Sequence, residues 1–226
     1  MFRAVLFDLD DTLADQESAA SAAVVSWARD HGVAGGDLSR RWSQISQVHY
    51  GRYQRRELTF AQQRRERARD LLAAKVDDDT ADEFFDGYLR RYEAGWQVFA
   101  DAVPALRRAR AAGLTVAVLT NGDEEHQRFK VETLGLADHL DLMIASSVLP
   151  AGKPDPRAFA HALDLVGVAA HETLMVGNSL DHDVRGALAA GPHAVLLDRH
   201  DAHPGVDLDL VTTLDDLTFA GRADVG

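Results

Sequence analysis

The 226-residue chain contains no cysteine, so disulfide bonds and thiol chemistry are both excluded. No run of apolar residues approaches the roughly 20 that a membrane-spanning helix needs. The N-terminus also lacks the basic stretch and the long apolar core of a signal peptide. We therefore expect a cytoplasmic protein that has no membrane partner.

Positive charge is scarce in this chain. The 24 basic residues face 36 acidic ones, which gives a net charge of −12, and lysine occurs only at positions 75, 130 and 153. Such a surplus of negative charge argues against binding of a nucleic-acid polymer through the overall field of the protein. A small anionic substrate remains compatible, because a metal ion and a few local cations can reverse the potential inside a cleft.

Strand-like and helical segments alternate through most of the sequence. With 46% hydrophobic and 27% charged residues, the composition is that of a globular protein large enough for a domain and a subdomain. Helical patterns with proline or acidic starts and glycine ends separate most of the strands, which predicts an α/β fold with a doubly wound, Rossmann-like parallel sheet. The predicted strands are 5–7, 114–120, 142–146, 173–176, 194–197 and, more weakly, 210–212.

The long interval after the first strand breaks this alternation. Residues 15–96 contain no convincing strand and instead show four helical patterns, at about 16–31, 38–50, 59–74 and 80–93. We interpret this interval as an inserted α-helical subdomain. The expected division is therefore a core of residues 1–14 and 97–226 and a helical insertion of residues 15–96.

The first strand ends in two carboxylates, Asp8 and Asp10. Ligands of open α/β sheets bind at the carboxyl ends of the strands. If the strand geometry persists, both side chains point to the same face. Two carboxylates at such a place are a natural site for Mg²⁺, which prefers oxygen ligands and is often shared with a phosphate.

Three further polar segments follow predicted strands. They are Thr120-Asn121-Gly122, Gly152-Lys153-Pro154-Asp155 and Gly177-Asn178-Ser179-Leu180-Asp181-His182-Asp183. In this order and spacing the four segments resemble the motifs of the haloacid-dehalogenase-like (HAD) hydrolase superfamily. The helical insertion after the first motif is similar to the superfamily's α-helical cap of the first type.

The resemblance implies a Mg²⁺-dependent phosphomonoester hydrolase that acts on a small phosphorylated metabolite through an aspartyl-phosphate. Asp8 would be the nucleophile, and Asp10 the general acid and then the general base. Thr120 and the backbone around Asn121 would hold the phosphoryl oxygens, and Lys153 would neutralise charge. The implied metal ligands and their supports are Asp8, the backbone carbonyl of Asp10, Asn178 and Asp183.

Several alternatives stay open within and beyond the superfamily. Its dehalogenase branch lacks a second aspartate, so Asp10 favours phosphoryl transfer over 2-haloacid dehalogenation. A sugar-phosphate mutase shares all four motifs. The fourth motif departs from the usual Gly-Asp at Asn178, which offers a metal an oxygen but no charge. That departure permits a catalytically weak phosphate-binding protein as a rival hypothesis.

The helical insertion contains an arginine-rich run from 52 to 69. A solvated helix face explains most of it. The functional alternative is that one or two of Arg52, Arg55 and Arg56 reach an anionic substrate, and we retain Arg52 and Arg56 as candidates. The pattern does not distinguish a monomer from a homodimer.

Overall fold

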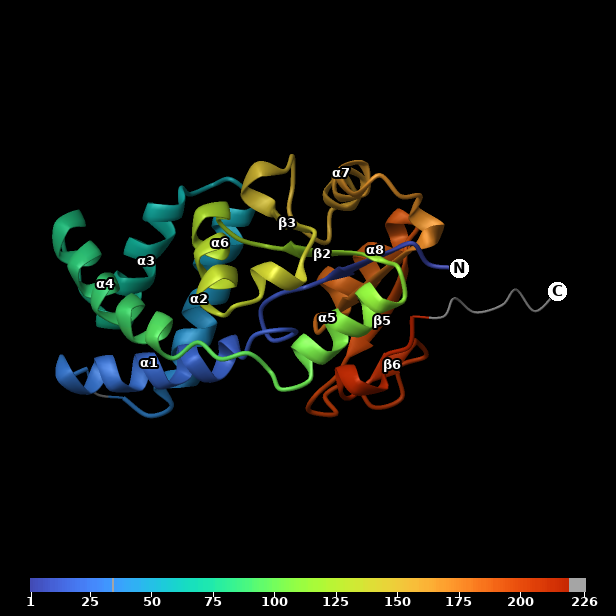
Figure 1. Ribbon diagram of the computed structural model, residues 1–226. Helices are drawn as coiled ribbons and strands as arrows, with labels where there is room; N and C mark the ends of the chain where they lie inside the picture. Colours follow the sequence, from blue (N-terminus) through green and yellow to red (C-terminus); the bar gives the residue numbers. More distant parts are fainter. Residues whose placement is uncertain (34, 220–226) are drawn as a thin grey trace. The chain divides into compact units, whose positions relative to one another are not determined.

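The computed structural model describes residues 1–33 and 35–219. The chain divides into two compact units. One contains Met1–Ala14 and the chain from Val98 onward, and the other is Asp15–Gln97. Each unit is built differently, the first around a sheet and the second from helices alone in its described residues (Figure 1).

Six strands of the first unit form one sheet in the order β3-β2-β1-β4-β5-β6, and every neighbouring pair is parallel. This confirms the predicted α/β fold class. β1 lies at the centre between β2 and β4, and its four residues are fully buried, as expected of a strand covered on both faces. The strands are β1 (Ala4–Phe7), β2 (Thr115–Thr120), β3 (Leu142–Ala145), β4 (Thr173–Gly177), β5 (His193–Leu197) and β6 (Leu210–Val211).

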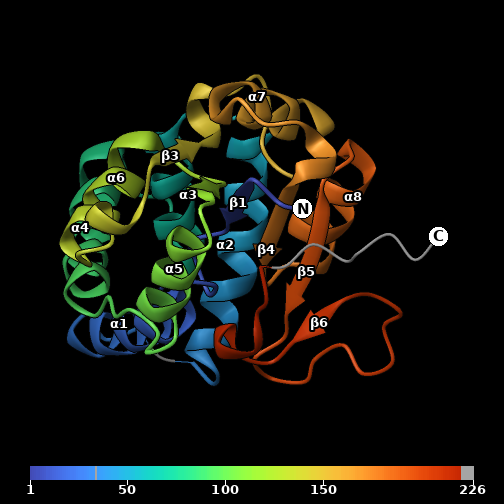
Figure 2. The same ribbon diagram turned by 45° about the vertical axis from the view of Figure 1, so that its right-hand side comes forward.

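Alternate residues of these strands build two hydrophobic layers, one on each face of the sheet. Phe7 packs into a layer with α5 (Ala102–Ala111), to which α6 (Glu124–Thr133) adds Val131. Leu6 packs on the opposite face, against α7 (Pro156–Val166) and α8 (Gly186–Ala190). Figure 2 shows α5 and α8 on opposite sides of the strands. Short 3-10 turns complete the unit at Ala137–His139, Ser146–Val148, Ala170–Glu172 and Leu214–Asp216.

The helical segment between β4 and β5 changes its geometry along its length. Leu180–Arg185 is a π-helix, and only Gly186–Ala190 is α-helical. The carboxylate of Asp183 accepts a hydrogen bond from the backbone N of Ser179 at 2.9 Å. This bond connects the side chain of Asp183 to the residue just before the π-helix. Wide turns of this kind are frequent at functional sites, and they are not visible in a hydrophobic pattern.

The second unit consists, in residues 15–33 and 35–97, of α1 (Gln16–Asp30), α2 (Leu38–Gln54), α3 (Phe60–Leu72) and α4 (Asp78–Ala94). Asp15, Asp37, Thr59 and Asp77 cap the four helices through side-chain hydrogen bonds to the first turn. α1 contacts α2 and α4, and α3 also contacts α2 and α4. Aromatic side chains such as Trp27, Trp42 and Tyr88 fill the interior.

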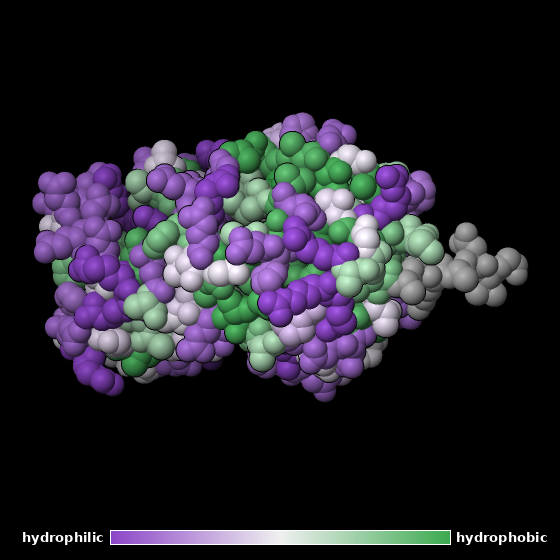
Figure 3. Space-filling model, viewed as in Figure 1, coloured by the Kyte–Doolittle hydropathy of each residue, from purple (hydrophilic) through white to green (hydrophobic). Residues whose placement is uncertain are grey.

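The outer faces of α3 and α4 are charged. Arg65 and Arg69 form ion pairs with Asp78, and Arg65 also pairs with Asp82. Figure 3 shows that the visible surface of this unit is mainly hydrophilic. No helix in the described part of the chain combines the length and the apolar character needed to cross a bilayer.

Candidate active site

The end of β1 places Asp8 in a buried position. Asp8 continues the pairing with β4 by one bond, because its backbone N donates to the carbonyl of Val176 at 2.9 Å. The chain then turns sharply at Asp11, whose φ of 61° lies in the left-handed region that aspartate tolerates better than most residues. The turn returns Thr12 to the strand end, where its Oγ1 lies 3.4 Å from Asp8 Oδ2.

Lys153 joins two of the predicted site carboxylates. Its Nζ donates to Asp8 Oδ1 at 2.7 Å and to Asp183 Oδ1 at 2.6 Å, and its side chain is only 2% exposed. Glycine at 177 is required for this arrangement, because a Cβ there would lie 2.3 Å from Asp183 Oδ2. Residues from the end of β1, from the π-helix after β4 and from the loop before α7 therefore meet around one ammonium group.

Asn121 fixes the loop that carries Lys153. Its Oδ1 accepts from the backbone N of Lys153 at 2.8 Å, and its Nδ2 donates to the carbonyl of Lys153 at 2.7 Å. Gly152 leaves room for this clamp, because a Cβ at that position would lie 2.8 Å from Asn121 Oδ1. The side chain of Asn121 thus orients Lys153, which the sequence reasoning had not anticipated.

Asp10 faces a different set of donors. Lys130 Nζ lies 2.5 Å from Asp10 Oδ1, and Gln127 Nε2 donates to Asp10 Oδ2 at 3.0 Å and to Thr120 Oγ1 at 2.8 Å. Gln127 and Lys130 are both almost fully buried and come from α6. Asp8 and Asp10 are therefore paired with different lysines, although both follow the same strand.

The two aspartates have opposite electrostatic environments. Burial, together with the negative charges of Asp183 and Asp10, raises the pKa of Asp8 to about 7, although Lys153 opposes that rise. Burial also acts to raise the pKa of Asp10, but Lys130 and Gln127 outweigh it and lower that pKa below its usual value. The pKa of Lys153 is raised because Asp183 and Asp8 outweigh its desolvation.

The hydroxyl group of Thr12 links Asn178 to Asp8. Asn178 Oδ1 is 3.4 Å from Thr12 Oγ1, and the backbone N of Asn178 donates to the same hydroxyl at 3.1 Å. One hydroxyl thus lies within 3.4 Å of a carboxylate oxygen from the end of β1 and an amide oxygen from the end of β4.

This donor set fits a hard divalent cation. Mg²⁺ prefers oxygen ligands, and Asp8 and Asn178 supply them. The raised pKa of Asp8 indicates that Lys153 does not fully compensate the buried negative charge. Among the described residues no group of three or more His, Cys, Asp or Glu side chains is arranged to hold a metal, so such a site would depend on the amide of Asn178 and a backbone carbonyl.

The structure brings together seven of the nine site residues expected from the sequence. These seven are Asp8, Asp10, Thr120, Asn121, Lys153, Asn178 and Asp183. The other two, Arg52 and Arg56, belong to the helical unit, where Arg52 lies 3.6 Å from Glu57. A role of these arginines in substrate binding stays a prediction.

Sequence reasoning missed Thr12, Gln127 and Lys130. A signal for the last two was present: they stand three residues apart on one helix face, and the helix follows the strand that ends at Thr120. Lysine is also rare in this chain, and two of its three occurrences are buried at this site.

Comparison with known proteins identifies the family. The sequence model of the haloacid dehalogenase-like hydrolases matches residues 2–191. The chain belongs to this family. HAD-fold structures agree: a putative HAD-hydrolase, YfnB from Bacillus subtilis bound to magnesium, superimposes with a TM-score of 0.81 at 21% identity, covering 95% of this chain and 96% of that one.

Named relatives of this HAD hydrolase include phosphatases and dehalogenases. The phosphoserine phosphatase of Thermus thermophilus is 42% identical over 134 residues, 59% of this chain and 48% of the relative. The phosphoglycolate phosphatase of Nitrosospira multiformis is 30% identical over 84% of this chain and 81% of its own. A 2-haloacid dehalogenase structure from Pseudomonas syringae pv. tomato has a TM-score of 0.68 at 28% identity, covering 95% and 96% of the two chains. Several curated relatives are matched over half of their length or less.

Proposed function

We propose that this HAD hydrolase is a Mg²⁺-dependent phosphomonoester hydrolase that acts on a small phosphorylated metabolite through an aspartyl-phosphate. The observation that carries the proposal is the buried contact of Lys153 with Asp8. A carboxylate held 2.7 Å from a buried ammonium group is oriented as a nucleophile beside a cation for the phosphoryl oxygens. The relatives named as phosphatases support the same reaction class.

In the first step a carboxylate oxygen of Asp8 attacks the phosphorus atom. The bond between phosphorus and the ester oxygen breaks, and Asp10, which must carry a proton in the enzyme–substrate complex to act as the acid, gives that proton to the leaving oxygen. In the second step Asp10 takes a proton from water, whose oxygen attacks the phosphorus atom and releases Asp8 and inorganic phosphate. Thr120 and Lys153 hold the phosphoryl oxygens throughout.

Asp8, Asn178 and the backbone carbonyl of Asp10 would hold Mg²⁺. When bound, the cation neutralises phosphoryl charge and favours the ionised form of Asp8. Asp183 stabilises the site through two hydrogen bonds. One of its oxygens accepts from Lys153 Nζ and the other from the backbone N of Ser179. The side chain of Asp10 is turned toward α6, which leaves its backbone carbonyl as the candidate ligand.

The helical unit would act as a cap that selects small substrates, with Arg52 and Arg56 as candidate contacts for an anionic group. If they have this role, replacing them with alanine raises KM and leaves kcat largely unchanged. A cytoplasmic location and a monomeric or homodimeric state stay predictions from the sequence.

The test is hydrolysis of p-nitrophenyl phosphate with and without Mg²⁺ by the wild type and by Asp8→Asn. The proposal expects Mg²⁺-dependent release of p-nitrophenol that the variant loses. Absence of turnover in the wild type for this ester and for a panel of metabolite phosphates would contradict the proposal and favour a phosphate-binding protein.

A dehalogenase is the second candidate, because the Pseudomonas syringae enzyme shares the fold at 28% identity. Asp10 argues against it, since carbon–halogen displacement needs no second carboxylate to protonate the leaving group. Release of chloride from 2-chloropropionate by the wild type, without phosphatase activity, would favour that candidate.

A further inference from the structure

Two buried polar residues of α6 contact Asp10, and no motif of the sequence analysis includes them. Gln127 is 3% exposed and Lys130 is 1% exposed. They stand three residues apart, so both side chains leave the same face of the helix. Burying an ammonium group and an amide is costly unless each is paired. The pairing found here is with Asp10 and, for Gln127, also with Thr120.

The two oxygens of Asp10 receive these donors separately. Lys130 Nζ meets Oδ1 at 2.5 Å, and Gln127 Nε2 meets Oδ2 at 3.0 Å. Two donors on two different oxygens fix the plane of a carboxylate as well as its position. Asp10 is nevertheless 28% exposed at its side chain, whereas Lys130 is 2% exposed. The carboxylate therefore remains accessible while the groups that hold it are shielded from water.

Gln127 also links Asp10 to the strand end that carries Thr120. Its Nε2 donates to Thr120 Oγ1 at 2.8 Å, so one amide group spans the ends of β1 and β2. The neighbouring Gly122 makes room for it. A Cβ at position 122 would lie 2.7 Å from Cγ of Gln127, too close for any other residue without displacing this side chain. The position of the Gln127 side chain thus explains why residue 122 of the Thr120-Asn121-Gly122 segment is a glycine.

We propose that Gln127 and Lys130 are positioning residues that hold the carboxylate of Asp10 in line with the leaving group, with Gln127 also fixing its distance to Thr120. The proposal rests on the proposed function, in which Asp10 transfers the proton. If the carboxylate moves away from the leaving oxygen, that oxygen departs as an anion without receiving a proton. The loss of kcat/KM in a variant must therefore grow as the leaving group becomes more basic.

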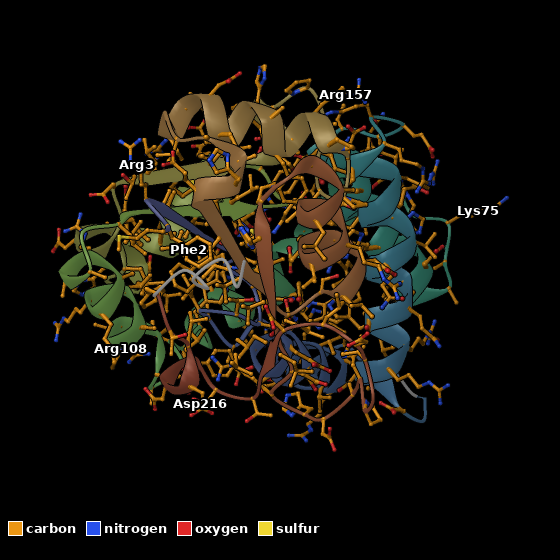
Figure 4. The ribbon with its side chains drawn as sticks, turned by 90° about the vertical axis from the view of Figure 1, so that its right-hand side faces the viewer. Phe2, Arg3, Lys75, Arg108, Arg157 and Asp216 are labelled. Carbon is orange, nitrogen blue, oxygen red and sulfur yellow. The ribbon has the colours of Figure 1, made fainter. Side chains whose placement is uncertain are left out.

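The experiment compares aryl phosphates of similar size, one with a weakly basic leaving group, p-nitrophenyl phosphate, and two with much more basic leaving groups, phenyl and p-methoxyphenyl phosphate. Values of kcat and KM are measured for the wild type, Lys130→Met and Gln127→Met at saturating Mg²⁺. Lys75→Met is the matched control, because Lys75 is exposed in the helical unit and projects into solvent (Figure 4). Thermal unfolding of each variant shows whether it is folded.

For Lys130→Met we expect kcat/KM to fall less than about 10-fold with p-nitrophenyl phosphate and about 10²–10³-fold with the two more basic leaving groups. Gln127→Met should show the same trend with smaller losses, together with a rise in KM because Thr120 loses a donor. It keeps the Lys130 charge pair, so it remains informative if Lys130→Met does not fold. Lys75→Met should match the wild type for all three esters.

An equal loss with every leaving group, or no loss in the folded variants, would overturn the proposal and leave the contact a structural ion pair. Failure of the proposed function looks different, because the wild type itself then hydrolyses none of the three esters.

Discussion

The site contains two pairs of a buried lysine with an aspartate from the end of β1, and the two pairs differ in charge balance. Lys153 serves Asp8 and Asp183 together, whereas Asp10 receives both Lys130 and the amide of Gln127. Burial, with the charge of Asp183 adding to it, raises the pKa of Asp8 to about 7, whereas Lys130 and Gln127 outweigh burial and lower the pKa of Asp10. Two carboxylates that are two residues apart thus differ because of what other segments bring to them.

This difference corresponds to a division of labour in the proposed reaction. The Asp8 pair has a surplus of negative charge, which suits a place where a divalent cation and a phosphoryl group meet. The Asp10 pair is compensated by the protein itself, which suits a group whose orientation must be kept while it exchanges protons with the leaving group and water.

The largest effect is expected from the nucleophile. Asp8→Asn should lower kcat by about 10³-fold or more, because the amide cannot form the phosphoryl intermediate. Binding of a phosphate ester should persist, and isothermal titration calorimetry with p-nitrophenyl phosphate measures it. A variant that keeps more than a tenth of the wild-type kcat would show that Asp8 is not the nucleophile.

The two lysines should respond differently to the same substitution. Lys153→Met should lower kcat/KM by about 10²–10³-fold for all three aryl phosphates alike, because Lys153 acts on phosphoryl charge and not on the leaving group. It should also lower the free energy of unfolding by roughly 3–5 kcal/mol, since Asp8 and Asp183 remain buried without their cation. Denaturant unfolding of both lysine variants measures the second effect. A dependence on the leaving group as steep as that of Lys130→Met would remove the distinction between the two pairs.

Asn178→Asp should shift the metal requirement with a smaller effect on turnover. An added carboxylate beside Asp8 increases the negative charge that a cation must compensate, so the Mg²⁺ concentration for half-maximal activity should fall severalfold. Titration of p-nitrophenyl phosphate hydrolysis with Mg²⁺ tests this. An unchanged midpoint would mean that residue 178 neither binds nor orients the metal.

A buried aspartate outside the site, Asp101, allows stability to be tested separately from catalysis. Asp101 accepts hydrogen bonds from Arg199 at 2.8 and 2.9 Å, from Thr213 at 2.8 Å and from the backbone N of Leu214 at 2.9 Å. Burial opposes these contacts, but they outweigh it and lower the pKa of Asp101 to about 2. We expect Asp101→Asn to reduce the free energy of unfolding at pH 7 by about 1–2 kcal/mol and to leave kcat nearly unchanged.

The pH dependence of that loss follows from the lowered pKa. The carboxylate stabilises the folded state fully above its unfolded pKa of about 3.8 and loses this contribution as the pH falls toward about 2. The difference in the free energy of unfolding between the wild type and Asp101→Asn, measured by denaturant unfolding, should therefore decrease as the pH falls through that interval. Asp155→Asn is the matched control. The pKa of Asp155 is also about 2, but this residue pairs with Arg157 at the surface, where an ion pair contributes little to stability. Asparagine also caps a helix as well as aspartate does. A difference between wild type and Asp101→Asn that stays constant from pH 7 to pH 2 would contradict this account.

The sequence predicted much of the architecture because its signals are local. Apolar runs and glycine or proline ends identified the strands and most helices, and the strand–helix alternation predicted a parallel sheet. The π-helix at Leu180–Arg185 was not predicted, because hydrophobic spacing does not distinguish a π-helical turn from an α-helical one.

By itself, the sequence determined the parallel α/β fold and the motif residues at the ends of its strands, because strand ends and motif spacing depend on residues that are close together in the sequence. Only the tertiary structure decided how those residues are partnered. It assigned Lys153 to two carboxylates, turned Asn121 onto the lysine loop, and placed Gln127 and Lys130 against Asp10. These contacts join residues 30 to 145 positions apart. The physical reason is that charge and hydrogen-bond balance in a buried site depends on distance in space, which folding alone sets.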